Sequence, residues 1–343
     1  MVRSLDVFST VKRASEFGVV VKDEVSLDWL RVIERKQYAI RNAEGDKAAD
    51  LKRRGIDYYK EPVTFVSPDE VTIGGERARP GKIIVATGSK PSMPPIPGIE
   101  HAITSDGALE LKELPASMVI IGGGFIALEF AHVFRQAGVK VTILEAKDRL
   151  LSAADGEISN AIKDSFIRQG MEVYTGAGVS GIEVQDGVKT VTATIAGEEK
   201  HFTTDIVLNA TGRVPSFDTL NLDGAGVLYS KKGIKVNEFM QTNLEHIYAA
   251  GDVTGGYMLT PVASYEARVA AQNAVSGNSR KMDYRVVPYA VFSRPEIGSV
   301  GLTEEEAQAK GIDYSLAYLD FATIGAAIVN GETEGFAKLI VDN

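Results

Sequence analysis

Three glycines that directly follow a short apolar run constrain the fold of this chain more than any other feature. The apolar run is Val119-Ile120-Ile121, and Gly122-Gly123-Gly124 comes next. Apolar residues then recur at helical spacing, at Ile126, Phe130, Val133, Phe134 and Ala137. Residues 140–144 return to a strand pattern that ends at Glu145. The segment therefore predicts a strand, a tight turn, a helix and a second strand.

This arrangement carries the G-x-G-x-x-A form of the dinucleotide-binding motif. Gly122 would make the tight turn, Gly124 would let the backbone approach a pyrophosphate, and Ala127 would let helix and strand pack closely. The helix N-terminus offers unpaired N–H groups and a positive dipole end to the phosphates. An ordinary glycine turn is the alternative, but both flanking strands favour a bound dinucleotide.

Glu145, at the end of the second strand, indicates which dinucleotide binds. A carboxylate there can accept hydrogen bonds from a ribose 2′-hydroxyl and repels a 2′-phosphate. Ala146 and Lys147 follow it and supply one cation instead of an arginine clamp. The sequence therefore favours NAD over NADP, and the alternative is that Glu145 is only a solvated strand end.

Composition narrows the class of protein. A net charge of −9 argues against a nucleic-acid or anionic-membrane partner, and no apolar run is long enough to span a bilayer. The chain has no cysteine and four scattered histidines, so we expect neither a thiolate nucleophile nor a metal site. The first residues lack the apolar core of a signal peptide, and a cytoplasmic location is the default expectation.

Two further turns resemble each other and suggest a second dinucleotide site. Ala86-Thr87-Gly88 and Ala210-Thr211-Gly212 each follow a predicted buried strand, where ligands of open α/β sheets bind. The run Ile247-Tyr248-Ala249-Ala250-Gly251-Asp252 predicts a strand that delivers Asp252 to a glycine-rich loop. Thr260 and Pro261 suit the N-cap and the first turn of the helix that follows, which would direct its positive end at the same ligand.

The remaining pattern predicts an alternation of helices and strands. We expect helices over 4–17 and 26–53, the second capped by Ser26 or Asp28, a short strand over 55–59 and an antiparallel pair over 63–66 and 71–73. A proline-rich segment ending at Gly98 is a candidate domain boundary. Later elements are a helix near 157–169, a strand over 171–175, a hairpin near 179–203, a helix over 303–310 and strands near Ala317 and Phe336.

Four stretches together resemble the flavin-dependent pyridine nucleotide–disulfide oxidoreductases. They are residues 119–145, 209–215 (Asn-Ala-Thr-Gly-Arg-Val-Pro), 247–252 and 288–295 (Pro-Tyr-Ala-Val-Phe-Ser-Arg-Pro). Residues 300–306 and 331–336 are most similar to dihydrolipoyl dehydrogenase within that family, and 258–261 also resembles glutathione and mercuric reductases. The resemblance covers essentially the whole chain.

The resemblance implies an α/β fold with two Rossmann-like FAD- and NAD(P)-binding domains and the start of an α+β interface domain. It places the first part of the FAD-binding domain at residues 1–98, the NAD-binding domain at 99–230, the second part of the FAD-binding domain at 231–282 and a partial dimerisation domain at 283–343. It also implies a homodimer for the parent enzyme.

The resemblance assigns roles to individual residues. Glu129 would lie near the junction of nicotinamide and flavin, and Phe125 or Ile126 would be the gate beside the flavin. The residues expected to bind NAD are Gly122, Gly124, Phe125, Ile126, Ala127, Glu145, Val179 and Gly212. Those expected to bind FAD are Thr87, Gly88, Ser89, Gly251, Asp252, Leu259 and Thr260.

The chain also departs from the family's pattern. The flavin-binding G-x-G-x-x-G is absent from residues 1–40, and the redox-active cysteine pair, its lysine and the C-terminal His-Glu dyad are missing. The resemblance therefore implies an internal fragment, truncated at both ends, that cannot exchange dithiols and disulfides by itself.

Three interpretations of function stay open. The first is an NAD-dependent flavoenzyme acting on a disulfide or dithiol, with dihydrolipoamide preferred and mercuric or glutathione-type reduction as alternatives. The second is a non-catalytic NAD-binding module. The third is a thiol-independent NADH oxidase or ferredoxin-reductase-like enzyme, which the absence of cysteine does not exclude.

Overall fold

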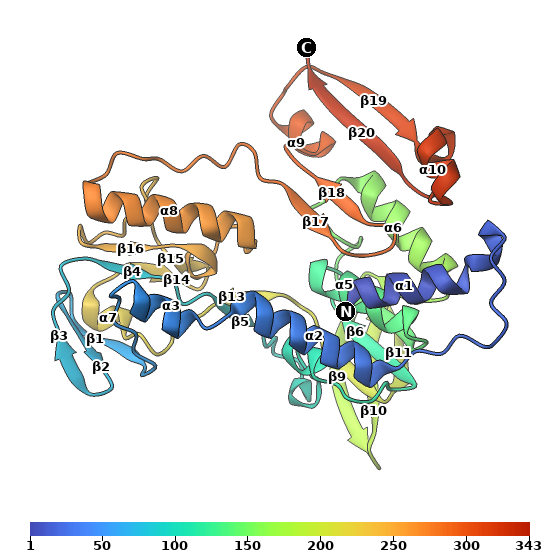
Figure 1. Cartoon of the computed structure of the whole chain (residues 1–343), viewed down its shortest axis with the longest axis horizontal. Coiled ribbons are helices and arrows are strands. Elements are labelled where there is room, and N and C mark those ends of the chain that lie inside the picture. The colour runs from blue at the N-terminus through green and yellow to red at the C-terminus, as the bar shows by residue number, and fades with distance from the viewer. The chain divides into compact units, whose positions relative to one another are not determined.

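The computed structural model describes residues 1–343, apart from the side chain of Glu44, and the chain divides into two compact units. Unit 1 comprises Met1–Ala39, Met93–Gly212 and Pro288–Asn343, and unit 2 comprises Ile40–Ser92 and Arg213–Val287 (Figure 1). One boundary, between Ser92 and Met93, falls in the proline-rich segment. The four-part division predicted from the sequence stays a prediction.

A four-stranded parallel sheet is the centre of unit 1. Its strand order is β12-β6-β7-β8, with β6 at Ser117–Ile121, β7 at Lys140–Glu145, β8 at Glu172–Thr175 and β12 at Ile206–Asn209. Helices α5 (Phe125–Gln136) and α6 (Gly156–Arg168) make the crossovers between successive parallel strands. The order β6, α5, β7 confirms the predicted strand, turn, helix and strand. The helix lies between the strands because parallel neighbours need a crossover connection.

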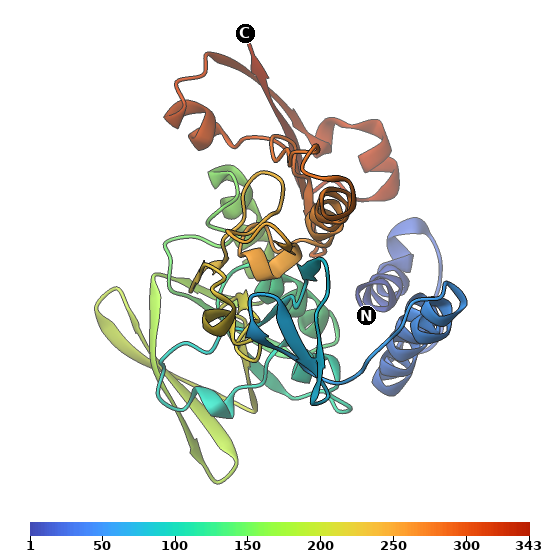
Figure 2. The ribbon, with the colours of Figure 1, turned by 90° about the vertical axis from the view of Figure 1, so that its left-hand side faces the viewer.

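An antiparallel sheet accompanies the parallel one in unit 1. It is formed by β9 (Ala177–Gln185), β10 (Val188–Ile195) and β11 (Glu198–Thr204), in the order β11-β10-β9. These strands form the long yellow-green ribbons in Figure 2. The hairpin predicted near 179–203 is therefore three strands, because a second turn, at Ala196 and Gly197 with positive φ, returns the chain once more.

Helix α5 packs through a face that differs slightly from the predicted one. Ala127, Leu128, Ala131 and Phe134 are fully buried, whereas Ile126 and Phe130 are only partly buried. Helix α1 (Val2–Lys12), which continues as the 3₁₀ turn η1 (Ala14–Phe17), buries Leu5 in the same hydrophobic cluster. Small residues at 127 and 131 let the backbone of α5 approach the sheet closely, which fixes the helix N-terminus at the strand ends.

The helix predicted over 26–53 is two helices. Helix α2 spans Trp29–Glu44 and α3 spans Lys47–Arg53. The break is at Gly45, which has a φ of 56°, and Asp46 then caps α3 by accepting a hydrogen bond from Ala49 N at 2.9 Å. Asp28 caps α2 as predicted, through a 3.0 Å bond from Arg31 N to Oδ1.

The strand predicted over residues 55–59 is wrong. These residues have no strand partner in the part of the chain that the structure describes, and Ile56, Tyr58 and Tyr59 are each about half exposed. A β-branched and aromatic run forms a strand only where it can pair and bury one face. Here neither condition is met.

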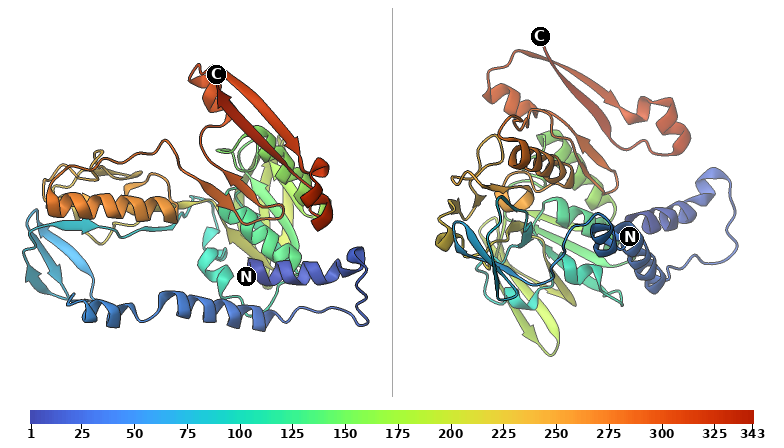
Figure 3. Two further views of the ribbon diagram at one scale, coloured as in Figure 1. Left: turned by 45° about the horizontal axis from the view of Figure 1, so that its top comes forward. Right: turned by 60° about the vertical axis from the view of Figure 1, so that its left-hand side comes forward.

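The C-terminal segment of unit 1 is α+β, as predicted. Its elements are β17 (Tyr289–Val291), β18 (Ile297–Ser299), α9 (Glu304–Ala309), β19 (Tyr314–Asp320), η4 (Phe321–Thr323), α10 (Gly325–Asn330) and β20 (Phe336–Asp342). Strands β19 and β20 pair antiparallel as a long ribbon, drawn in red in Figure 3, with α10 at one end. Unit 1 also contains η2 (Ile99–His101) and α4 (Ser105–Leu109).

Unit 2 is built around a short parallel pair, β4 (Ile83–Val85) and β16 (Ile247–Ala249). Around it lie β1 (Val63–Ser67), β2 (Glu70–Ile73), β3 (Glu76–Ala78), β5 (Ser89–Pro91), β13 (Arg213–Pro215), α7 (Leu222–Ala225), β14 (Tyr229–Ser230), β15 (Gly233–Ile234), η3 (Gly251–Thr254) and α8 (Thr260–Ser276). The predicted antiparallel pair over 63–73 is confirmed as β1 and β2. Among the described residues, no helix is long and apolar enough to cross a membrane.

Candidate nucleotide-binding sites

The glycine turn after β6 needs glycine at its first position for steric reasons. Gly122 has a φ of 114°, and a Cβ added there would lie 2.4 Å from the carbonyl oxygen of Ala210. The backbone is held on both sides, because Gly122 N donates to Leu144 O at 2.8 Å and Ala210 N donates to Ile121 O at 2.9 Å. No side chain fits there without moving the end of β12.

Gly124 has a different reason to be glycine. It is the N-cap residue of α5, with a φ of −86°, and nothing lies within 4 Å of the position that its Cβ would take. In the described part of the chain, no side chain caps the first turn of this helix. The first-turn N–H groups of α5 thus have no side-chain acceptor, as expected of a helix end that binds an anionic phosphate.

Glu145 ends β7 and lies against the glycine turn. Its Oε2 is 2.8 Å from the position that a Cβ would take at Gly123, and its Oε1 accepts a hydrogen bond from Lys147 N at 2.7 Å. The side chain is partly buried. A carboxylate held beside an open helix N-terminus suits a ribose hydroxyl, so the residues present fit a dinucleotide.

The other residues predicted to bind NAD also lie in unit 1. Phe125 and Ile126 form the first turn of α5 and are partly buried, and Ala127 is fully buried behind them. Gly212 follows β12 with a φ of 120° and open space around it. Val179 lies in β9 and packs on a hydrophobic cluster that includes Ile121 and Leu144, the ends of β6 and β7.

Glu129 lies one turn further along α5 than the glycine turn. Its Oε1 accepts a hydrogen bond from Phe292 N at 3.1 Å. Partial burial raises the pKa of this carboxyl, and the bond from Phe292 only partly opposes that rise. In the same region, the ring of Phe125 meets that of Tyr289 edge-on at 5.3 Å. The helix thus carries a partly desolvated acid on the face that packs against β17 and the residues after it.

The second set of predicted residues lies in unit 2, at the carboxyl ends of β4 and β16. These strands are parallel neighbours, and Ala250 N donates to Val85 O at 3.0 Å. Asp252 follows β16, and its Oδ2 accepts a hydrogen bond from Ser89 Oγ at 2.6 Å. Thr87 donates its hydroxyl to Ser216 O, and Gly88, with a φ of 69°, has open space around it. The structure thus brings Ser89 and Asp252 together.

Helix α8 begins beside this turn, with one correction to the prediction. Its N-cap residue is Leu259 rather than Thr260, because Thr260 already has helical geometry and Pro261 follows it in the first turn. In the described part of the chain, no side chain caps this end either. Gly251, with a φ of 77°, approaches the helix so closely that a Cβ would lie 3.3 Å from Ala263 Cβ. An open helix N-terminus next to a fixed carboxylate fits a second phosphate-bearing ligand.

Sequence reasoning missed two residues behind this second site. Arg213 donates from Nε to Ser89 Oγ and from Nη2 to Ser89 O, both at 2.7 Å. Glu266, in α8, accepts a hydrogen bond from Gly251 N at 2.7 Å. Arg213 lies inside the motif 209–215, and Glu266 lies on the buried face of α8, which is mostly apolar and also holds Asn273. An acid at an apolar helical spacing was the available signal for Glu266.

A cavity of about 450 Å³ in unit 1 is lined by none of the residues predicted to bind NAD or FAD. Its lining comes from the amino-terminal halves of β6 and β7, from β8 and from β11, with Ser117, Lys140, Tyr174 and Phe202 among its residues. Ligands of open parallel sheets bind at the carboxyl ends of the strands. The open helix N-termini therefore identify the candidate sites better than cavity size does.

Comparison with known families agrees with this geometry. The family "Pyridine nucleotide-disulphide oxidoreductase" matches residues 14–267, and its dimerisation domain matches residues 287–343. Together they cover both units. The α/β fold with a nucleotide-binding region and the start of an interface domain is thereby confirmed.

Curated relatives include two kinds of enzyme. A mercuric reductase of Staphylococcus aureus is 37% identical over 319 residues, which is 92% of this chain and 58% of the relative. A dihydrolipoyl dehydrogenase of Bacillus subtilis is 36% identical over 363 residues, covering 100% of this chain and 76% of the relative. The chain thus spans well under two thirds of the mercuric reductases it matches and about three quarters of the dihydrolipoyl dehydrogenases.

A solved structure has the same fold. The HOCl-induced flavoprotein disulfide reductase RclA from Escherichia coli superimposes with a TM-score of 0.84 at 32% sequence identity, covering 92% of this chain and 74% of that one. This chain belongs to the pyridine nucleotide–disulphide oxidoreductases, a family of flavoproteins that use FAD together with NAD(P).

Proposed function

We propose that this chain is part of an enzyme that transfers hydride between NAD(H) and FAD for a disulfide or dithiol substrate. The observation that carries the proposal is the open N-terminus of α5 at Gly124, with the Glu145 carboxylate beside it. FAD, when bound, supplies the chemistry that links two-electron hydride transfer to thiol–disulfide exchange. The chain's own residues bind and orient the two nucleotides.

The roles of the residues follow from their positions. Gly122 and Gly124 would admit the NAD pyrophosphate to the N–H groups of α5, and Glu145 would accept from the adenosine ribose. Asp252, fixed by Ser89, would accept hydrogen bonds from hydroxyl groups of FAD. The N-terminus of α8 would direct its positive dipole end toward the same ligand. Glu129 would sit beside the reacting rings, where burial raises the pKa of its carboxyl above the usual range.

Dihydrolipoamide is our preferred substrate, with mercuric or glutathione-type reduction as the alternative. Dihydrolipoyl dehydrogenases support the first choice because they match the full length of the chain. Mercuric reductases support the second because their identity to the chain is as high, 37% over 92% of it. The chain has no cysteine, so either reaction needs thiols that these 343 residues do not contain.

A homodimer is the assembly that we propose for the enzyme, with a cytoplasmic location. The match of residues 287–343 to the family's dimerisation domain supports the dimer. The β19–β20 ribbon also exposes apolar side chains on its surface, at Leu316, Tyr318, Leu319, Leu339 and Val341, each about half exposed. Covering these apolar side chains with a second chain would remove them from water, which favours association.

Flavin uptake and reduction test the proposal. Purified protein mixed with FAD and freed of excess ligand should stay yellow, and NADH added without oxygen should bleach the flavin absorbance. A colourless protein that binds NADH would instead support the non-catalytic module. Rapid oxidation of NADH by oxygen would support the thiol-independent oxidase, provided that the complete enzyme, with its thiols, also fails to reduce lipoamide.

Cofactor selectivity tests the role of Glu145. The variant Glu145→Ala with Ala146→Arg should lower the ratio of NADH to NADPH affinity by about tenfold or more, or about 1.4 kcal/mol, because a ribose acceptor is exchanged for a phosphate partner. Dissociation constants from fluorescence titration measure it. Glu113→Ala, which removes an exposed carboxylate of the same unit, is the matched control. An unchanged ratio would show that Glu145 does not contact the ribose.

A further inference from the structure

Glu266 is a buried acid whose partners are unusual. It lies in the middle of α8 and is only 1% exposed. Buried carboxylates are rare unless a cation pairs with them. Among the described residues, no lysine, arginine or histidine forms an ion pair with Glu266. Its oxygens accept instead from Gly251 N and from the hydroxyl of Tyr284, each at 2.7 Å.

The N–H group that Glu266 binds belongs to a tight turn. Gly251 has a φ of 77°, and the turn after it is closed by bonds from Thr254 Oγ1 to Gly251 O at 2.9 Å and from Gly255 N to Asp252 O at 3.0 Å. The residue next to this N–H is Asp252. Glu266 therefore restrains the backbone on one side of Asp252.

Ser89 restrains Asp252 from the other direction. Its hydroxyl donates to the Asp252 carboxylate at 2.6 Å and is itself bound by Arg213 at 2.7 Å. The side chain of Asp252 is thus fixed from β5, and its main chain from α8. A carboxylate that must meet ligand hydroxyl groups gains from such double restraint, because less freedom is lost on binding.

We propose that Glu266 is a positioning residue of the flavin site, which holds Asp252 in its binding geometry through the Gly251 N–H. This inference rests on the proposed function, since it assumes that Asp252 binds FAD. Glu266 does not face the ligand. It acts through a charge-assisted hydrogen bond, which is roughly twice as strong as a neutral one.

Protonation should loosen this restraint. Burial, and to a smaller degree the neighbouring Asp252, raise the pKa of Glu266, while the bonds from Tyr284 and Gly251 oppose the rise. The groups that face the Glu266 carboxyl are Gly251 and Asp252 from η3 and Tyr284 from the segment after α8. A neutral carboxyl holds the Gly251 N–H less firmly, so FAD should leave faster as the pH falls toward the raised pKa.

Amide hydrogen exchange tests the contact directly. In Glu266→Gln the exchange of the Gly251 and Asp252 amides should accelerate about tenfold or more, because a charged acceptor becomes neutral. Tyr284→Phe keeps the bond to Gly251, and Glu245→Gln changes an exposed acid of the same unit. Both should change the exchange of these amides by less than about threefold. Unchanged exchange in Glu266→Gln would overturn the proposal, whether or not FAD binds.

FAD binding separates positioning from simple structural support. Glu266→Gln should weaken FAD binding by about tenfold or more, leave NADH affinity unaltered and remove the acceleration of FAD dissociation that the unaltered protein shows as the pH falls toward the raised pKa of Glu266. A residue needed only for folding would lower thermal stability without removing that pH dependence, and this result would overturn the positioning role. If the unaltered protein fails to bind FAD, the proposed function fails, and the exchange at Gly251 still decides the contact made by Glu266.

Discussion

Replacing Gly124 by aspartate is expected to weaken NADH binding severely while leaving the protein as stable as before or slightly more stable. The added side chain enters open space at a backbone φ of −86°, which any residue adopts. Aspartate at an N-cap position accepts from the first-turn N–H groups and complements the helix dipole, together worth about 0.5–1 kcal/mol. The same carboxylate occupies the place of the phosphates and repels them.

NADH titration and thermal unfolding measure the two halves of this prediction. The dissociation constant of Gly124→Asp should rise by about a hundredfold or more, or about 2.7 kcal/mol, with an unchanged or higher Tm. Gly124→Ser, a neutral capping residue, should weaken NADH less. Gly122→Ala should instead lower the Tm, because its Cβ would meet Ala210 O at 2.4 Å. Tight NADH binding by Gly124→Asp would remove α5 from the cofactor site.

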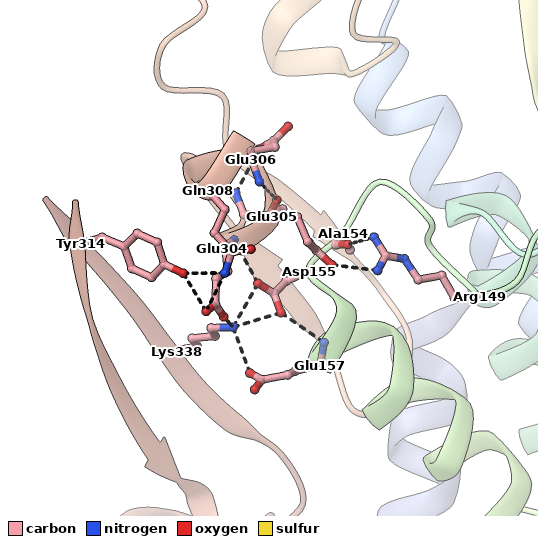
Figure 4. A network of polar contacts seen from close by, with 11 residues as sticks. Arg149, Ala154, Asp155, Glu157, Glu304, Glu305, Glu306, Gln308, Tyr314 and Lys338 are labelled. Atoms are coloured by element: carbon pink, nitrogen blue, oxygen red, sulfur yellow. Dashed lines mark hydrogen bonds and ion pairs between the residues drawn. The ribbon is translucent and has the colours of Figure 1, made fainter. Parts of the chain in front are cut away.

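Replacing Lys338 by methionine is expected to cause a large loss of stability. Lys338 Nζ contacts Asp155 Oδ2 at 3.2 Å, Glu157 Oε2 at 3.1 Å and the carboxylate of Glu304 (Figure 4). Lys338 and Asp155 are almost buried, with side chains 9% and 10% exposed, whereas more than half of Glu157 is exposed. Without the ammonium group, three carboxylates remain close together with no cation between them.

The free energy of unfolding, from urea denaturation at neutral pH, should fall by about 3 kcal/mol in Lys338→Met, the cost of removing one partner of a buried pair. Lys310→Met, an exposed lysine of the same segment, should change it by less than about 0.5 kcal/mol. Adding Asp155→Asn to Lys338→Met should recover part of the loss. A fall in Lys338→Met no larger than that of the Lys310 control would show that the network does not hold the C-terminal segment to α6.

The difference between Lys338→Met and the unaltered protein should shrink in acid. Burial opposes the shift, but hydrogen bonds from the backbone of Glu304 and Glu157 and from Lys338 lower the pKa of Asp155 below 3.8. The bond from Lys338 lowers the pKa of Glu304 below 4.5. Groups with a depressed folded pKa stabilise the protein above their unfolded pKa and lose that effect as pH falls through the folded value. Denaturation below about pH 4 should therefore show a smaller gap than at neutral pH.

Local patterns allowed the nucleotide motif of unit 1 to be predicted from sequence. Strand, glycine turn, helix and acid lie within 27 consecutive residues, 119–145, and each neighbour in the sequence is also a neighbour in space. A crossover between adjacent parallel strands leaves little freedom once the strands and the turn are recognised. The positions of Gly122, Gly124 and Glu145 follow from that geometry.

Contacts between distant residues could not be predicted in the same way. Ser89 and Asp252 are 163 residues apart, and Lys338 and Asp155 are 183 residues apart. Their pairing depends on how strands from different parts of the chain align. Two predictions of local structure were wrong. The helix over 26–53 was predicted as one element because its helical periodicity obscured the end at Gly45 and the new cap at Asp46. The strand over 55–59 was predicted from its residue types, but these residues have no partner strand among the described residues.

Amide exchange of the protein with and without saturating NADH tests the central claim most directly, since the claim is that the nucleotide lies across the N-terminus of α5. The expected result is slower exchange at residues 122–128 and around Glu145, lost in Gly124→Asp. Saturable binding that protects β8 and β11, around the cavity lined by Tyr174 and Phe202, would contradict the account, as would the absence of saturable binding to the folded protein.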